Sequence, residues 1–251
     1  MRQAERLSAI LERLSTDGSL GVTELSSALG VSSATIRRDL QLLEGQRLLS
    51  RTHGGAVPQG VLYELPLRYK TSRYHEEKLR IAREAASRVG DGSAIGLTGG
   101  TTTTEVARAL VDRQQLTVVT NALNIASELA VRSNLKLVVT GGVARESYEL
   151  VGPIAEASLA GLNLDIVFLG VDGISPDAGL TTHHEVEAHT DLALIDRARS
   201  VTVVADSSKL GRVAFARICE MTRVNELITD AGADAGAVAA IEDRGVRVTT
   251  V

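Results

Sequence analysis

Apolar residues near the start of the chain recur at spacings of three and four, which predicts a helix over residues 2–15 with one apolar face. They are Leu7, Ile10, Leu11 and Leu14. The polar stretch TDGSLG ends this pattern. The run ELSSALG then predicts a short second helix, with Thr23 as its N-cap and Gly30 at its end.

A third helix is predicted to extend to about residue 46, with Ser32 or Ser33 as its N-cap. Ile36, Leu40 and Leu43 share one face and can pack on the second helix. Two short helices joined through a glycine are typical of a helix-turn-helix. Arg37, Arg38 and Gln41 point away from the apolar face. Either a solvated helix surface or a contact with DNA would explain these polar residues.

The segment LLSRTHGGAVP favours the DNA contact, because a leucine-rich strand followed by Gly-Gly predicts a hairpin like the wing of a winged helix. Arginine also forms paired hydrogen bonds with guanine edges and phosphates. We therefore predict a set of DNA-binding residues at the helix starts, on the third helix and in the wing. They are Thr23, Ser32, Ser33, Thr35, Arg37, Arg38, Gln41, Arg51 and His53.

Beyond residue 74 the pattern changes to apolar runs that alternate with helical segments. A helix is expected over residues 74–89, and further helices over 103–111, 123–130 and 185–197. The apolar runs are SAIGLTG, LTVVTN, LKLVVTGG, DIVFLGVDG, SVTVVAD, ELITD and VRVTTV. Strands alternating with helices predict an α/β fold with a mostly parallel sheet covered on both faces.

Ligands of such sheets bind at the carboxyl ends of the strands, and small polar residues follow these runs. In TGGTTTTE a strand ends, two glycines turn the chain and a helix begins, so free backbone N–H groups could bind an anion. A simple helix cap is the alternative. Arg145 and Lys209 supply cations for the same rim. The segment has neither the P-loop nor the dinucleotide-binding glycine pattern, so we expect no cofactor.

Composition limits the class of protein. The chain has 251 residues, 44% hydrophobic, with a formal net charge of −4. Residues 1–80 carry 12 basic and 9 acidic side chains, and the remainder carries 15 and 22, an asymmetry that indicates separate tasks for the two parts. Cys219 is the single cysteine, which fits a reducing cytoplasm. No run approaches the ~20 apolar residues that span a bilayer.

The segment SSATIRRDLQLLEGQRLLSRTHGGA resembles the DNA-binding signature of the DeoR-type (DeoR/GlpR family) bacterial transcriptional regulators. The segments GGTTTTEVARAL, VVTNALNIA, VVTGGVARE, FLGVDGISPDAGLT and ADSSKLG resemble the effector domain of the same family, which is similar in fold to ribose-5-phosphate isomerase. The resemblance implies a winged helix-turn-helix and a sugar-phosphate sensor.

By this resemblance, the glycine–threonine loop holds the phosphate and the other rim residues border the sugar. The implied effector-binding residues are Gly99, Gly100, Thr101, Thr102, Thr103, Asn121, Gly141, Gly142, Arg145, Asp172 and Lys209. The family loop usually begins Asp-Ser-Gly, whereas this chain has Thr98-Gly99-Gly100. A carboxylate that would orient a sugar hydroxyl is therefore absent from the loop.

Two alternatives remain. A sugar-phosphate isomerase with an accessory DNA-binding head would need a carboxylate base. Asp172-Gly173 resembles part of the isomerase motif, but the Lys-Gly-Gly-Gly segment and its glutamate have no clear counterpart, so we predict no enzyme activity. In HHEVEAH, His184 and His189 are five residues apart, the wrong spacing for a zincin. His183, Glu185 and His189 stay open as metal ligands, but we predict polar residues at a helix start and no metal.

The predicted organisation is a winged helix-turn-helix over 1–57, a linker over 58–74 and an α/β effector-binding domain over 75–251. We predict a cytoplasmic transcriptional regulator, a repressor of a sugar or polyol catabolic operon that a phosphorylated sugar relieves. Two operator half-sites would require a homo-oligomer, a dimer or tetramer. Fructose phosphates, glycerol 3-phosphate and amino-sugar phosphates are all open as effectors.

Overall fold

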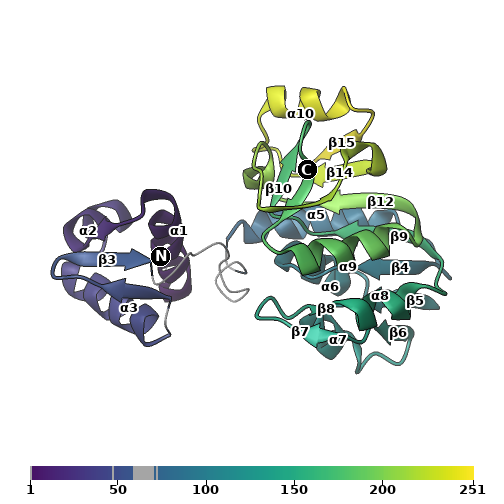
Figure 1. Ribbon diagram of the computed structural model, residues 1–251, viewed down its shortest axis with the longest axis horizontal. Helices are drawn as coiled ribbons and strands as arrows, with labels where there is room; N and C mark the ends of the chain where they lie inside the picture. Colours follow the sequence, from purple (N-terminus) through teal and green to yellow (C-terminus); the bar gives the residue numbers. More distant parts are fainter. Residues whose placement is uncertain (1, 47, 59–70, 72) are drawn as a thin grey trace. The chain divides into compact units, whose positions relative to one another are not determined.

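The computed structural model describes residues 2–46, 48–58, 71 and 73–251. The chain divides into two compact units, an N-terminal unit of Met1–Arg73 and a C-terminal unit of Tyr74–Val251. Figure 1 draws both units with their element labels. The predicted linker over 58–74 falls largely on residues 59–70 and 72, which lie outside the described residues.

Among its described residues, the N-terminal unit has three helices and a three-stranded antiparallel sheet in the order β1-β3-β2. Its elements are α1 (Gln3–Asp17), β1 (Leu20–Gly21), α2 (Val22–Leu29), α3 (Ser33–Gly45), β2 (Leu49–Arg51) and β3 (Gly55–Pro58). Gly18 and Gly30 end α1 and α2 in the left-handed conformation that glycine adopts without strain. The three helices and the wing strand therefore lie in the regions where the hydrophobic pattern predicts them, but α2 begins earlier than predicted.

A single apolar core holds this unit together. Every apolar residue of the predicted stripes is buried in it, together with Leu25, Leu49 and Ala56. Arg6 and Asp39 are also buried, and they form an ion pair between α1 and α3 in which Arg6 Nη2 lies 3.1 Å from Asp39 Oδ1. Since each charge satisfies the other, the pair fixes α1 against α3 at this point.

The C-terminal unit is built around a seven-stranded sheet in the order β15-β14-β12-β9-β4-β5-β6, in which all pairs are parallel. The strands are β4 (Ala94–Leu97), β5 (Leu116–Thr120), β6 (Leu135–Val139), β9 (Leu164–Leu169), β12 (Ala198–Val204), β14 (Glu226–Thr229) and β15 (Arg247–Thr250). Each coincides with a predicted apolar run, and the α/β fold class is confirmed.

Helices cover both faces of this sheet (Figure 1). One face packs against α5 (His75–Ser87), α6 (Thr101–Ala109) and α7 (Leu123–Leu129). The other packs against α8 (Pro153–Leu159), α9 (Glu185–Ile195) and α10 (Ala235–Glu242). Alternate residues of β9 enter the two cores, with Phe168 on the first side and Val167 on the second.

Smaller elements extend the carboxyl ends of the sheet. The hairpin of β7 (Val143–Ala144) and β8 (Leu150–Val151) follows β6. An antiparallel sheet is formed by β10 (Gly173–Ser175), β11 (Gly179–Thr182) and β13 (Ala216–Cys219). The short helices η1 (Ser207–Lys209) and η2 (Met221–Arg223) complete the unit.

Candidate functional site

The exposed side of α3 carries the polar residues that the sequence predicts. Arg37, Arg38 and Gln41 are exposed, while Ile36 and Leu40 on the opposite side are buried. One helix thus separates its core face from a cationic face. Because the guanidinium groups are held on a rigid helix packed into the core, they are positioned to meet a surface of fixed shape such as a DNA groove.

Ser32 is the N-cap of α3, as predicted. Its hydroxyl oxygen accepts a hydrogen bond from the backbone N–H of Thr35 at 3.2 Å, and the two hydroxyl oxygens lie 3.0 Å apart. Ser33, the alternative cap, is the first residue of the helix and is half-buried. The cap sets the orientation of the first turn, which is the part of a recognition helix that approaches bases.

The prediction of Thr23 as the N-cap of α2 is wrong. Gly21 is the N-cap, and its backbone N–H lies 3.5 Å from Glu24 Oε2. The helix begins earlier because β1 pairs with β3 and places Gly21 directly before the first helical residue. Thr23 is exposed on the first turn of α2.

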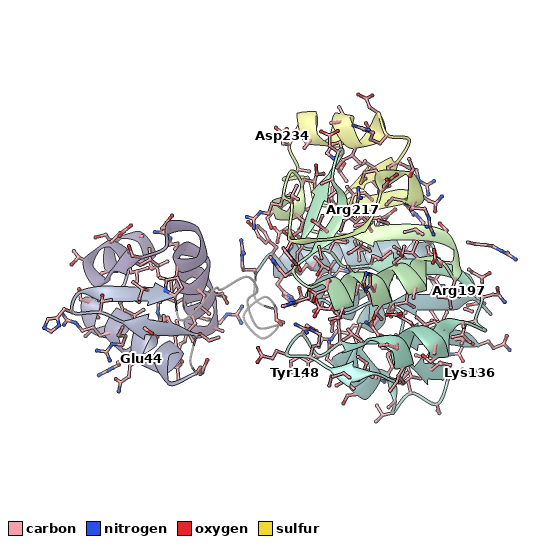
Figure 2. The ribbon with its side chains drawn as sticks, viewed as in Figure 1. Glu44, Lys136, Tyr148, Arg197, Arg217 and Asp234 are labelled. Carbon is pink, nitrogen blue, oxygen red and sulfur yellow. The ribbon has the colours of Figure 1, made fainter. Side chains whose placement is uncertain are left out.

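Strands β2 and β3 form the predicted wing, and Arg51 and His53 are both exposed in it. Glu44 at the end of α3 ties the wing to the helix, since it accepts a hydrogen bond from the backbone N–H of Arg51 at 3.0 Å and lies 3.7 Å from its guanidinium. Figure 2 marks Glu44 among the charged side chains of this unit. The wing base requires Gly55, because a Cβ there would lie 1.8 Å from the carbonyl oxygen of Leu20.

In the C-terminal unit, the sheet topology places the loops after β4 and β9 at its switch point. The chain runs from β4 outward through β5 to β6, and it then returns to the opposite side of β4 with β9. The two loops touch, since Gly170 N donates to the hydroxyl of Thr98 at 3.0 Å and a Cβ on Gly170 would lie 2.9 Å from the Gly99 carbonyl oxygen. Open α/β sheets bind ligands at this point.

Helix α6 begins at this switch point. Gly100 is its N-cap, with a φ of 125° that favours glycine, and it has no side chain to cap the first N–H groups. The hydroxyls of Thr103 and Thr104 donate hydrogen bonds to the Gly100 carbonyl oxygen, at 3.0 and 2.6 Å. Thr101 is partly exposed at the helix start, whereas Thr102 and Thr103 are buried. Gly100 and Thr101 therefore form the accessible part of the predicted loop, and Gly99 is buried.

The predicted residues after β5 and β6 are Asn121 and the two glycines Gly141 and Gly142. Asn121 is fully buried. A Cβ on Gly141 would lie 2.7 Å from the side chain of Ile154, and one on Gly142 would lie 2.7 Å from the Val151 carbonyl oxygen. Both glycines therefore allow β8 and α8 to pack closely on this loop.

Asp172 and Lys209, which were both predicted for the effector site, meet at the carboxyl end of β9. Lys209 Nζ lies 3.2 Å from Asp172 Oδ1. Thr182, at the end of β11, donates its hydroxyl hydrogen to Asp172 Oδ2 at 3.2 Å, and His183 Nε2 lies 3.9 Å from the same oxygen. A cation from η1 and a carboxylate from the loop after β9 thus lie together beside the switch point.

Arg145 belongs to the same polar network. It extends from the β7–β8 hairpin, and its Nε donates to Glu187 Oε1 on α9 at 3.0 Å. The hydroxyl of Ser147 donates to the same oxygen at 2.7 Å, and Thr182 Oγ1 lies 3.5 Å from Glu187 Oε2. Charged groups from the β7–β8 hairpin, the loop after β9, η1 and α9 therefore converge on one edge of the unit.

Asp191 lies behind this network on α9 and is buried. Burial, followed by the negative charges of Glu187 and Asp172, raises the pKa of its carboxyl group well above the usual value. Its Oδ1 has no hydrogen-bond partner among the described residues. The side chain is therefore best accommodated in its protonated, neutral form.

Several residues of this region were not predicted. They are Ser147, Glu149, Thr182, Glu187 and Asp191. HHEVEAH drew attention to the start of α9, but only as a helix start or a metal site. The described residues contain no cluster of three or more metal-ligating side chains. Within the same residues, no helix is long and apolar enough to cross a bilayer.

The two units define a class of protein. A winged helix-turn-helix with exposed arginines, joined to an α/β unit with a polar rim at its switch point, is the architecture of a ligand-responsive DNA-binding regulator. Residues 6–59 match the DeoR-like helix-turn-helix domain, and residues 73–231 match the DeoR C terminal sensor domain. The chain therefore belongs to the DeoR family of transcriptional regulators.

Relatives match along nearly the whole chain. It is 38% identical to the HTH-type transcriptional regulator GlpR of Haloferax volcanii, with 99% of this chain and 98% of that protein covered. It is 34% identical to the glycerol-3-phosphate regulon repressor of Escherichia coli, with 99% of each covered. The HTH-type transcriptional repressor GlcR of Bacillus subtilis is 35% identical over 92% of this chain and 89% of its own. The family consists of regulators rather than enzymes.

Among solved structures, ribose 5-phosphate isomerase A from Methanocaldococcus jannaschii aligns with 54% of this chain and 54% of its own, at 22% identity and a TM-score of 0.41. The probable sor operon regulator from Shigella flexneri aligns with 69% of this chain and 89% of its own, at 11% identity and a TM-score of 0.43.

Proposed function

We propose that this protein represses a sugar or polyol catabolic operon, and that a phosphorylated sugar or polyol bound to the C-terminal unit releases it from its operator. The observation that carries the proposal is the start of α6 at the switch point of the sheet, where the N-cap is Gly100, a residue without a side chain to occupy the helix start. Such a helix start attracts phosphate through its N–H groups and its dipole.

The rim around that helix start suits the rest of such a ligand. Asn121 follows the neighbouring strand, and Arg145, Asp172 and Lys209 converge from other loops. These groups both donate and accept hydrogen bonds, as a hydroxyl-rich ligand requires. Relatives are named as a glycerol-3-phosphate regulon repressor and as GlpR, which supports a small phosphorylated effector.

The N-terminal unit supplies the proposed operator contacts. Arg37, Arg38 and Gln41 would enter the major groove, while Arg51 and His53 of the wing would contact the backbone. A pseudo-palindromic operator would require at least a dimer of this chain. Release follows if the effector prefers a conformation of the oligomer whose paired heads no longer match the half-sites.

A thermal-shift screen tests the ligand class. Fructose phosphates, glycerol 3-phosphate and glucosamine 6-phosphate would be compared with their unphosphorylated parents. A ligand at 100 times its Kd stabilises a protein by about 2.7 kcal/mol, so a true effector raises Tm clearly. At least one phosphorylated compound should raise Tm while its parent does not. No response to any phosphorylated compound would contradict the proposal.

A further inference from the structure

The carboxylate of Glu149 lies directly against the loop that begins α6. A Cβ added to Gly99 would be 2.2 Å from Glu149 Oε1, 2.4 Å from its Cγ and 2.5 Å from its Cδ. Gly99 is therefore needed for space, because the glutamate occupies the volume that any side chain at this position would fill. An acidic group consequently lies beside the proposed phosphate site.

The backbone of Glu149 is anchored on both sides. Leu150 N donates to the Asn121 carbonyl oxygen at 2.7 Å, and Leu123 N donates to the Tyr148 carbonyl oxygen at 2.8 Å. An antiparallel bridge pairs Ala122 with Glu149 between these two bonds. Figure 2 marks Tyr148 on this side of the unit, opposite Lys136 and Arg197 near the strand starts. The glutamate is thus held at this place by the β5–α7 connection.

Asn121 supplies a second acceptor at the same place. Its Nδ2 lies 3.4 Å from Glu149 Oε2, so the amide is directed toward the carboxylate. The side chain is fully buried, yet its Oδ1 has no hydrogen-bond partner among the described residues. A buried carbonyl oxygen without a donor is costly, and a ligand that brings a donor relieves that cost.

We propose that Glu149 and Asn121 form a hydroxyl-binding subsite beside the phosphate site, and that Glu149 is the residue that selects a polyol phosphate over other phosphate esters. This inference rests on the proposed function. The backbone N–H groups at the start of α6 are hydrogen-bond donors, whereas the Glu149 carboxylate and the side-chain Oδ1 of Asn121 are acceptors. A ligand that carries a phosphoryl group next to a free hydroxyl complements both parts.

The Glu149 carboxylate also disfavours the binding of phosphorylated ligands that lack the hydroxyl. A phosphoryl group placed beside Glu149 is repelled by a like charge unless a hydroxyl hydrogen bond compensates. Sites built to bind a hydroxyl reject analogues without it, because a polar group of the site is then left unpaired, as the buried Asn121 Oδ1 would be here. Glu149 therefore weakens binding of bare phosphate and strengthens binding of polyol phosphate, two effects of opposite sign.

Calorimetric titration of the full-length protein separates these effects. The wild type, Glu149→Ala and Glu149→Gln would be titrated with glycerol 3-phosphate, fructose 6-phosphate, ribose 5-phosphate, glucosamine 6-phosphate, propyl phosphate and inorganic phosphate. For the polyol phosphates that the wild type binds, Glu149→Ala should lose affinity about tenfold or more, with Glu149→Gln in between. Inorganic phosphate and propyl phosphate should bind the variants as tightly as the wild type or more tightly.

Glu146→Gln is the matched control, because it removes the same charge from an exposed position of the same hairpin. Gly99→Ala adds a second test, since the added Cβ displaces the Glu149 carboxylate. When Glu149 is present, this substitution should weaken the binding of polyol phosphate. In the Glu149→Ala background the same substitution should cause little further loss, as expected for coupled residues. Unliganded Tm values establish that each variant is folded.

The outcomes are distinct. If Glu149→Ala binds the polyol phosphate as tightly as the wild type or more tightly, the subsite is wrong, while the proposed function stands. If the wild type binds none of the phosphorylated compounds, the proposed function itself fails. Loss of polyol phosphate affinity with retained phosphate affinity supports both.

Discussion

Arg145 on the β7–β8 hairpin and Glu187 on α9 are 42 residues apart in the sequence, and they form an ion pair with an Nε–Oε1 distance of 3.0 Å. The side chain of Glu187 is 3% exposed and that of Arg145 is 30% exposed. The pair links the hairpin that carries Glu149 to the helix that carries Asp191. It therefore connects the proposed ligand site to the interior of the unit.

Arg145→Ala should destabilise the protein by about 2–4 kcal/mol, because it leaves the buried Glu187 without its cation. Denaturant unfolding measures this loss. Glu187→Gln in the same background should recover part of it, since the neutral amide does not need the guanidinium. If the free energy of unfolding of Arg145→Ala lay within about 0.5 kcal/mol of the wild-type value, the ion pair would not stabilise the fold.

Substituting Arg37 and Arg38 together by alanine should remove specific operator binding while effector binding stays intact. Each arginine that pairs with a base contributes about 1–3 kcal/mol of discrimination, so the loss should reach at least about tenfold. Fluorescence anisotropy with DNA from upstream of the protein's own operon measures it. Arg83→Ala, an exposed arginine of α5, serves as the control. Retained specific binding by the double variant would refute the role of the α3 face.

Thr101→Leu should give a repressor that binds its operator but no longer responds to effector. Thr101 is the partly exposed residue at the start of α6, and a branched apolar side chain there obstructs access to the N–H groups. Calorimetry with the effector and anisotropy with operator DNA measure the two activities separately. The exposed Thr222 provides a matched control as Thr222→Leu. Normal release of the Thr101 variant would argue against the phosphate loop.

Asp191→Asn should stabilise the protein near neutral pH. Burial raises the pKa of Asp191, so the folded state holds a proton that the unfolded chain loses near pH 3.9. Stability is therefore lost as pH rises from the unfolded pKa through the raised folded pKa. The variant should gain about 2–4 °C in Tm at pH 7, with a smaller gain at low pH. Equal Tm values of the variant and the wild type at every pH would contradict this assignment.

The strands and the helix-turn-helix were predictable because each depends on a local pattern. Continuous apolar runs such as LTVVTN mark buried parallel strands, and Ile36 and Leu40 mark the core face of α3. The sheet β10-β11-β13 was not predicted, because its short strands are formed by tertiary pairing within polar loops. The start of α2 was misplaced for the same reason, since the pairing of β1 with β3 determines it.

For the site, the sequence predicted which loops come together but not which side chains contact one another. Parallel strands bring their carboxyl ends together, so Asp172 and Lys209 could be grouped in advance, and the structure places them 3.2 Å apart. Glu149 could not be found in this way, since its position against Gly99 depends on how the hairpin folds over the β5–α7 connection. Glu187 likewise enters the site through the packing of α9.

The most direct test of the account is the anisotropy of labelled DNA from upstream of the protein's own operon, measured with and without the phosphorylated ligand found by thermal shift. The account predicts salt-sensitive, sequence-specific binding that falls when the phosphorylated compound is added and stays unchanged with its unphosphorylated parent. Binding without sequence preference, or binding that the phosphorylated ligand leaves unchanged, would contradict it.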